Sequence, residues 1–222
     1  MQAFVKRHYP LLFPVCINML VYYGAKGLLR GAVFHDVRTA WDGFIPFLPS
    51  WVLIYVAAFP FWIIAYMRIA GVSRTYTTRF CSAEIIGKLV CGTIFLLYPS
   101  MNVRPNLTVD GPLTGLLSFI WHVDAPTILC PSIHCYLSWV CFIWTFRVRD
   151  RLGRGYTIFT FVMAVLICLS TLFTKQHALP DVISGVVLAQ CTLLLGMKTS
   201  IHRPFAALIQ RLDGCLFKNT GA

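Results

Sequence analysis

Long apolar stretches separated by short polar segments run along most of the chain. A helix needs about 20 mainly apolar residues to cross the hydrocarbon layer of a membrane, so slightly shorter stretches with helical length still qualify as spans. The pattern predicts an all-α, polytopic membrane protein with six transmembrane helices. The six stretches lie at residues 11–28, 51–70, 82–98, 132–146, 156–173 and 182–196.

Composition agrees with this class, because 58% of the 222 residues are apolar and only 12% are charged. The sequence contains no long Ser/Gly linker, low-complexity tract or fixed-period repeat, which indicates a single six-span domain over residues 1–222. Lys6 and Arg7 precede the first apolar stretch, but no small-residue cleavage site follows it. We therefore expect no removable signal peptide.

Charged residues indicate how the chain is oriented. If the N-terminus is inside, the inner segments hold most of the 19 lysines and arginines, and the outer segments hold most of the acidic residues. Cytoplasmic loops of membrane proteins carry this excess of cations. We predict a multi-pass protein of the cell membrane with both termini cytoplasmic. The net charge of +11 then needs no nucleic-acid partner, because anionic lipids of the inner leaflet attract such basic loops.

The nine cysteines do not indicate a metal site, because no pair has the spacing of zinc ligands. The predicted outer loops also lack a cluster of acidic side chains that resembles a coordination sphere. We predict no metal and no cofactor.

The first of two polar clusters is Cys-Pro-Ser-Ile-His-Cys at residues 130–135. Pro131 suits the first turn of a helix, so Ser132 and His134 are predicted at a helix N-terminus. Free backbone N–H groups and the helix dipole favour an anion at that position, and the Ser132 hydroxyl can add a donor to a phosphate. The alternative is that Ser132 only caps the helix.

The second cluster, at residues 174–181, contains His177 and Asp181. Four residues separate them at the start of a predicted helix, which places the carboxylate within reach of the imidazole. An imidazole oriented in this way can act as a base or as a nucleophile, and His134 can act as a general acid. Alternatively, the pair makes a purely structural hydrogen bond.

At these residues the chain resembles the type 2 phosphatidic acid phosphatase superfamily, over residues 98–185. The second motif of the family, P-S-G-H, corresponds to residues 131–134, and the third, S-R-x5-H-x3-D, corresponds to residues 170–181. The resemblance implies that His177 attacks phosphorus to form a phosphohistidine and that Asp181 orients His177. It also implies that His134 protonates the leaving alcohol, and it places the catalytic core at about residues 98–196.

Two cations of the family motifs are missing. Leu97 stands where the first motif, K-x6-R-P, has lysine, and Thr171 replaces the arginine of the third motif. Arg104, from the remaining R-P pair, and Lys175 are candidate substrate-binding residues that would stabilise the transferring phosphoryl oxygens. Alternatively, Arg104 binds lipid head groups and Lys175 extends to the membrane interface. Fewer cations suit a singly charged phosphodiester better than a phosphate monoester.

The resemblance implies a lipid phosphatase that hydrolyses a lipid phosphate or diphosphate at the extracytoplasmic face without a metal. One alternative is a transferase, similar to sphingomyelin and inositol phosphorylceramide synthases, that moves a phosphorylated head group between lipids. Another is a non-catalytic, transporter-like protein that binds anions. The expected partners are a lipid phosphate substrate and the bilayer, while the lipid and the oligomeric state stay open.

Three further polar residues fall near the predicted outer surface, and we consider each as a possible contact for a lipid head group. They are Tyr98, His122 and Asp124. The apolar stretch at residues 113–123 is too short to cross a membrane. We expect it to lie along the outer interface and to guide a lipid toward His134.

Overall fold

The structure is a computed structural model, and it describes residues 1–217. The described chain is nearly all-α, with two strands of two residues each. Residues 218–222, which belong to the predicted single domain, lie outside the described part. In chain order the elements are α1 (Gln2–His8), η1 (Tyr9–Leu11), α2 (Leu12–Leu28), β1 (His35–Asp36), η2 (Ala40–Gly43), η3 (Pro49–Trp51), α3 (Val52–Ala70), α4 (Arg74–Leu97), β2 (Ser100–Met101), α5 (Pro112–Val123), α6 (Ile133–Arg147), α7 (Arg149–Leu152), α8 (Arg154–Phe173), α9 (Leu179–Lys198) and α10 (His202–Leu216).

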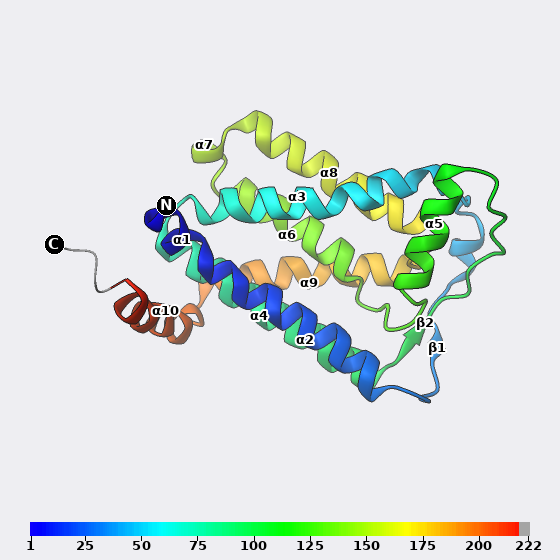
Figure 1. Cartoon of the computed structure of the whole chain (residues 1–222), viewed down its shortest axis with the longest axis horizontal. Helices are drawn as coiled ribbons and strands as arrows, with labels where there is room; N and C mark the ends of the chain where they lie inside the picture. The colour runs from blue at the N-terminus through cyan, green and yellow to red at the C-terminus, as the bar shows by residue number, and fades with distance from the viewer. Residues whose placement is uncertain (218–222) are drawn as a thin grey trace.

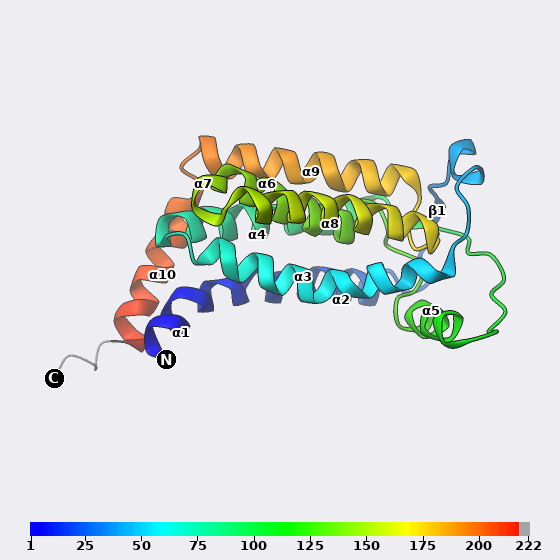
Figure 2. The same cartoon turned by 90° about the horizontal axis from the view of Figure 1, so that it is seen from above.

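The long helices form a bundle in which α6 is central (Figures 1 and 2). α6 packs against α3, α8 and α9, while α4 packs against both α2 and α9. Tyr136 and Trp144 of α6 are fully buried among these neighbours. Gly87 of α4 lacks a Cβ at the place where the Tyr136 ring ends, which leaves room for this ring between the helices.

Five helical segments of the described chain are long and apolar enough to cross a membrane: Gln2–Leu28, Pro49–Ala70, Arg74–Leu97, Arg154–Phe173 and Leu179–Lys198. α6 corresponds to the fourth predicted span, but it has only 15 residues. Because its neighbours enclose it, α6 can carry buried polar residues such as Ser138 and Thr145. The multi-pass prediction is supported, and the count of six spans stays a prediction.

Two helical segments begin earlier than the hydropathy pattern predicted. The first runs from Gln2 instead of residue 11, and α4 starts at Arg74 instead of residue 82. The first turns of α4 are polar, but Thr78 and Ser82 donate their hydroxyl hydrogens to carbonyl oxygens of the preceding turn. Internal hydrogen bonding of this kind allows polar residues to extend a buried helix.

β1, β2 and α5 lie together at one end of the bundle, which we call the site end (Figure 1). β1 pairs with β2 in parallel, with His35 opposite Ser100, and Met101 also forms a bridge with Thr127. These pairings join the loops that precede α3, α5 and α6. α5 has 12 residues and lies across the site end, so it does not span the bundle.

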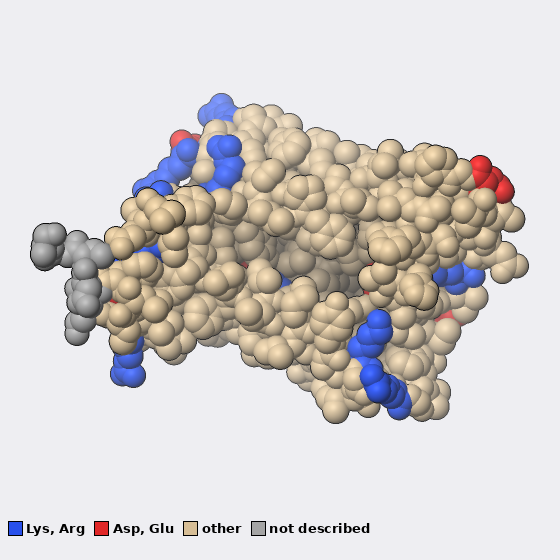
Figure 3. All heavy atoms as spheres, in the orientation of Figure 1, with Lys and Arg blue, Asp and Glu red and all other residues tan. Residues whose placement is uncertain are grey.

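α1, α7 and α10 lie at the opposite end, which we call the distal end (Figures 1 and 2). Arg74 and Asp213 form an ion pair of 2.6 Å that holds α10 against the start of α4. On the face shown in Figure 3, charged side chains gather toward the two ends and leave the band between them almost free of charge. Such a band is suited to the hydrocarbon layer of a membrane.

Candidate functional site

The two polar clusters of the sequence meet where α6 and α9 begin. The Ser132 backbone N–H donates to the Asp181 carbonyl oxygen at 3.0 Å. A Cβ on Gly185 would lie 2.6 Å from the Ser132 carbonyl oxygen, so only glycine permits this approach of the two helices. As a result, the ring centroids of His134 and His177 are 5.7 Å apart.

The predicted contact between His177 and Asp181 is present. Nδ1 of His177 lies 3.3 Å from Oδ2 of Asp181, and the same oxygen accepts the Ala178 N–H at 2.9 Å. Asp42 adds a cap from a distant loop, because its Oδ1 accepts the Leu179 N–H at 2.7 Å. These bonds fix the start of α9 and leave Nε2 of His177 without a hydrogen bond to the described residues.

Asp181 also changes the acidity of His177. Burial lowers the pKa of His177, but hydrogen bonding and charge attraction to the Asp181 carboxylate raise it more, so the net pKa lies above 6.5. The carboxylate therefore stabilises the positively charged ring, which is the form that develops when Nε2 reacts with an electrophile.

His134 belongs to a separate network that contains two tyrosines. Its Nε2 lies 2.8 Å from the Tyr55 hydroxyl oxygen, and the same hydroxyl is 3.1 Å from Oδ2 of Asp124. Tyr22 donates to the other carboxylate oxygen, Oδ1, at 2.7 Å. The network connects α2, α3, the end of α5 and the start of α6.

Asp124 is charged in this network. Burial raises its pKa, but the nearby imidazole of His134 and the hydroxyl of Tyr22 lower it more, and the net pKa lies below the usual range. Of the three polar residues considered near the predicted outer surface, Asp124 is linked to His134 through the Tyr55 hydroxyl. Tyr98 instead stacks on His35, and His122 lines neither of the cavities described below.

Ser132 is the N-cap of α6. Its side chain is buried, and its Oγ accepts the Cys135 N–H at 3.3 Å. This is the capping role considered as the alternative to phosphate binding, and a contact of Ser132 with substrate stays a prediction.

Arg104 lies in the loop between β2 and α5, and its side chain contacts the C-terminal end of α5 and Gln176. Its guanidinium donates to the carbonyl oxygens of Trp121, at 3.0 Å, and Asp124, at 2.8 Å, and to Oε1 of Gln176. Burial lowers the pKa of Arg104. Its Nε is buried and has no hydrogen-bond partner among residues 1–217.

Lys175 adopts a left-handed backbone conformation, with φ of 53°, in the turn between α8 and α9. Its Nζ donates to the carbonyl oxygens of Ile45, at 2.6 Å, and Asp42, at 3.3 Å. Burial lowers the pKa of Lys175. Thr171, which replaces the arginine of the family motif, is buried, and its hydroxyl donates to the carbonyl oxygen of Cys168.

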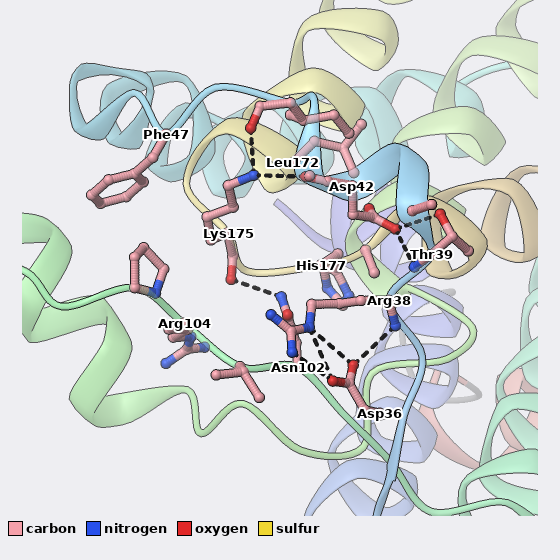
Figure 4. A pocket seen from close by; sticks show the side chains of 16 residues that line it. Asp36, Arg38, Thr39, Asp42, Phe47, Asn102, Arg104, Leu172, Lys175 and His177 are labelled. Carbon is pink, nitrogen blue, oxygen red and sulfur yellow. Dashed lines mark hydrogen bonds and ion pairs between the residues drawn. The ribbon is translucent and has the colours of Figure 1, made fainter.

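Two cavities meet at His177. The first is a polar cavity of about 630 Å³ at the site end, and Arg104 and Lys175 also line it (Figure 4). Asp36, Asp42 and Asn102 are further polar residues of its wall. Arg38 is paired with Asp36 at 2.6 Å in the same wall.

The second cavity, of about 510 Å³, is mainly apolar and lies between α2 and α3. Figure 3 shows a hollow between these helices with a mostly uncharged rim. His134, Asp124, Tyr22 and Tyr55 line the cavity toward the site end, and Tyr66 and Lys88 line it deeper in the bundle. His134 does not line the polar cavity, whereas His177 is the residue of the described chain that lines both cavities.

Sequence reasoning missed Tyr22, Tyr55 and Gln176 as parts of the site. The two tyrosines fall within apolar stretches, where tyrosine commonly serves packing, and no local spacing distinguishes them. Gln176 precedes His177 directly, which is the only sequence signal it carries. Its Nε2 is buried and has no partner within the described chain.

No group of three or more His, Cys, Asp or Glu side chains within residues 1–217 is arranged to hold a metal ion. The arrangement that is present consists of a carboxylate-oriented imidazole beside a second imidazole. Together they can provide a nucleophile for a phosphorus atom and a proton for its leaving oxygen.

Comparison with known proteins agrees with this chemistry. The profile of the PAP2 superfamily matches residues 76–203, from the first turns of α4 to the start of α10. No curated protein and no solved structure matches the chain significantly. Members of the superfamily are generally phosphatases or phosphotransferases. Because the match covers more than half of the 222 residues and includes His134, His177 and Asp181, the chain belongs to the PAP2 superfamily, also called the type 2 phosphatidic acid phosphatase superfamily.

Proposed function

We propose that this protein hydrolyses a lipid phosphate or diphosphate at the extracytoplasmic face of the membrane through a phosphohistidine on His177. The main support is the position of His177, which lies where the polar cavity meets the apolar cavity and 5.7 Å from His134 between ring centroids. A phosphate held there would have its lipid chain in the apolar cavity and its charged oxygens in the polar cavity.

The reaction proceeds in two steps. Nε2 of His177 attacks phosphorus while His134 gives its proton to the departing lipid oxygen, so a P–N bond forms and a P–O bond breaks. Water then attacks the phosphorus of the phosphohistidine and gives a proton to His134. A P–O bond forms and the P–N bond breaks, so phosphate leaves, His177 is free again and His134 is again protonated. Asp181 stabilises the positive His177 ring in the first step.

Arg104 is the cation best placed to bind phosphoryl oxygens. It lines the polar cavity beside His177 and retains a buried N–H without a partner in the described chain. Lys175 lines the same cavity, but its Nζ is engaged by two carbonyl oxygens. Donors held in a partly dehydrated site stabilise charge that develops on oxygen.

The experiment compares purified wild-type protein with His177→Ala against lipid phosphate monoesters, diphosphates and head-group diesters, without added metal. His202→Ala, in α10 at the distal end, is the matched control. We expect inorganic phosphate from the wild type and the control, and a loss of about a thousandfold or more in His177→Ala. Equal turnover by His177→Ala, or anion binding without any turnover, would exclude the proposed reaction.

The face of the membrane can be tested with the same assay in sealed vesicles of known sidedness. The proposal rests on the excess of Lys and Arg in the segments at the distal end, which favours a cytoplasmic location for that end. We expect turnover of substrate added to vesicles whose original outer face points outward. Turnover only in inverted vesicles would reverse the assignment.

The size of the polar cavity favours a second candidate, which is head-group transfer. A volume of about 630 Å³ is much larger than a phosphate group and lies within the range of small-molecule sites. The missing cations of the family motifs also suit a singly charged phosphodiester. Movement of a labelled head group to an added lipid alcohol, without release of phosphate, would identify the protein as a transferase.

A further inference from the structure

We propose that Asp124 and Tyr55 form a positioning relay for His134, in which the carboxylate acts through the tyrosine hydroxyl to orient the imidazole and stabilise its protonated form. The inference rests on the proposed function, because it concerns how His134, the general acid of that reaction, is oriented and protonated. Tyr55 provides the central contact, with its hydroxyl oxygen 2.8 Å from His134 Nε2 and 3.1 Å from Asp124 Oδ2.

The number of hydrogens available determines which group donates in each hydrogen bond of this network. A carboxylate only accepts hydrogen bonds, and a tyrosine hydroxyl has a single hydrogen to donate. Because Asp124 is ionised, Tyr55 donates that hydrogen to Asp124 and must accept one from Nε2 of His134. The neutral imidazole therefore carries its hydrogen on Nε2, and Nδ1 is the atom that takes up and delivers the catalytic proton.

No ion pair within residues 1–217 neutralises the charge of Asp124, so it can act on His134. Within residues 1–217 its carboxylate makes no ion pair, since Arg104 donates to the backbone oxygen of Asp124 and not to the side chain. The tyrosine hydroxyls satisfy both carboxylate oxygens without neutralising them. The negative charge of Asp124 therefore favours a protonated imidazole at His134, and it also acts on Arg104 and His177 nearby.

A structural role alone explains the network less well. Asp124 lines a mainly apolar cavity, where an unpaired carboxylate is unfavourable. Tyr22 and Tyr55 come from two different helices and converge on the carboxylate, and Tyr55 continues to His134. Such an arrangement keeps a charge beside a reacting group, as buried carboxylates do for the histidines of other active sites.

The test uses two substrates that differ in their need for a general acid. One is an alkyl phosphate, whose alkoxide leaving group must be protonated. The other is the phosphate ester of a nitrophenol that carries the same alkyl chain, whose leaving group departs without a proton. Release of the leaving group in the first turnover is measured for the wild type, Tyr55→Phe and Asp124→Asn.

The controls make the same chemical changes away from the site. Tyr76→Phe removes a buried hydroxyl that donates to the Trp144 carbonyl oxygen at 2.5 Å. Asp213→Asn alters a distal carboxylate that likewise accepts a tyrosine hydroxyl, from Tyr9 at 2.8 Å. Both controls leave the histidines and the two cavities untouched.

We expect Tyr55→Phe and Asp124→Asn to lose roughly 10-fold to 100-fold on the alkyl phosphate and less than about threefold on the nitrophenol ester. Equal losses on both substrates by folded variants, or losses no larger than those of the controls, would overturn the relay. If Tyr55→Phe does not fold, Asp124→Asn decides. Wild-type protein that turns over neither substrate would instead refute the proposed function.

A second measurement needs no activity. Nitrogen-15 NMR of histidine-labelled protein reports which ring nitrogen carries the hydrogen, and a His134→Gln variant assigns the signals. We expect the Nε2–H form of neutral His134 in the wild type and loss of this preference in Tyr55→Phe. A neutral His134 that carries its hydrogen on Nδ1 in the wild type would contradict the relay even if the protein is a phosphatase.

Discussion

At the scale of single residues, the two histidines of the proposed reaction have different neighbours. His177 contacts the Asp181 carboxylate directly, whereas His134 contacts a tyrosine that in turn contacts Asp124. The first arrangement suits a nucleophile that must become positively charged. The second suits a proton donor that gives up its proton in the first step and regains one in the second.

The pH dependence of turnover tests the pairing of His177 with Asp181. His177 must be neutral to attack, and its pKa is raised above 6.5, so kcat/KM should fall as the pH drops through this raised value. Asp181→Asn removes the cause of the increase while burial remains. We therefore expect the acidic limb to move to lower pH and the maximal rate to fall by roughly a hundredfold or more.

The control for this prediction is Asp213→Asn, whose carboxylate lies at the distal end. Its pH profile should match that of the wild type. The groups that act on His177 besides Asp181 are Cys135, Asp124 and His134, and they are unchanged in both variants. An acidic limb that stays in place in Asp181→Asn would show that Asp181 does not set the pKa of His177.

At the scale of helices, the contact between α6 and α9 brings the two histidines together. Gly185 allows this contact because the Ser132 carbonyl oxygen occupies the space that a Cβ would need. The hydrogen bond from the Ser132 N–H to the Asp181 carbonyl oxygen holds the two helix starts in register. α6, which has 15 residues, is enclosed by α3, α8 and α9.

Gly185→Ala should disturb this contact. The added methyl group would lie 2.6 Å from a backbone oxygen, so α9 and α6 must separate and the distance between the two imidazoles must change. We expect a loss of about 1–3 kcal/mol in the free energy of unfolding and at least a tenfold lower kcat. Thermal unfolding and steady-state kinetics measure the two effects.

Gly155→Ala in α8 is the matched control, because nothing lies within 4 Å of the position of its Cβ. Alanine is a better helix former than glycine, so this variant should be neutral or more stable by up to about 1 kcal/mol. If Gly185→Ala behaves in the same way, close approach of α6 and α9 is not required for activity.

At the scale of the whole molecule, the two cavities would separate the polar and apolar parts of the proposed lipid substrate. The polar cavity opens among the loops of the site end, while the apolar cavity lies between α2 and α3 in the uncharged band of the surface. A lipid can therefore approach His177 from the side of the bundle, and water can approach from the site end.

Filling the apolar cavity should impair turnover of lipids selectively. Val15→Trp places a large side chain at a wall position of this cavity. We expect KM for a long-chain lipid phosphate to rise about tenfold, which corresponds to about 1.4 kcal/mol, with little change for a short-chain ester. Leu20→Trp, also in α2 but exposed and outside the cavity wall, is the control. Equal effects of Val15→Trp on both substrates would argue against lipid binding between α2 and α3.

The sequence alone was sufficient for properties that depend on local pattern. Hydropathy identified a multi-pass helical membrane protein, and motif spacing identified the PAP2 superfamily, which the family comparison confirmed. The contact between His177 and Asp181 followed from their separation by four residues. Each of these features depends on residues that lie close together in the sequence, so the sequence alone can reveal it.

Only the tertiary structure decided which distant residues meet. Tyr22, Tyr55, Asp124 and His134 are far apart in the sequence, and their network exists because α2, α3, α5 and α6 converge at the site end. The two cavities and the short, enclosed α6 likewise depend on packing between helices of similar composition. Hydrophobic pattern cannot specify that packing, because burial in lipid and burial against another helix favour the same apolar side chains.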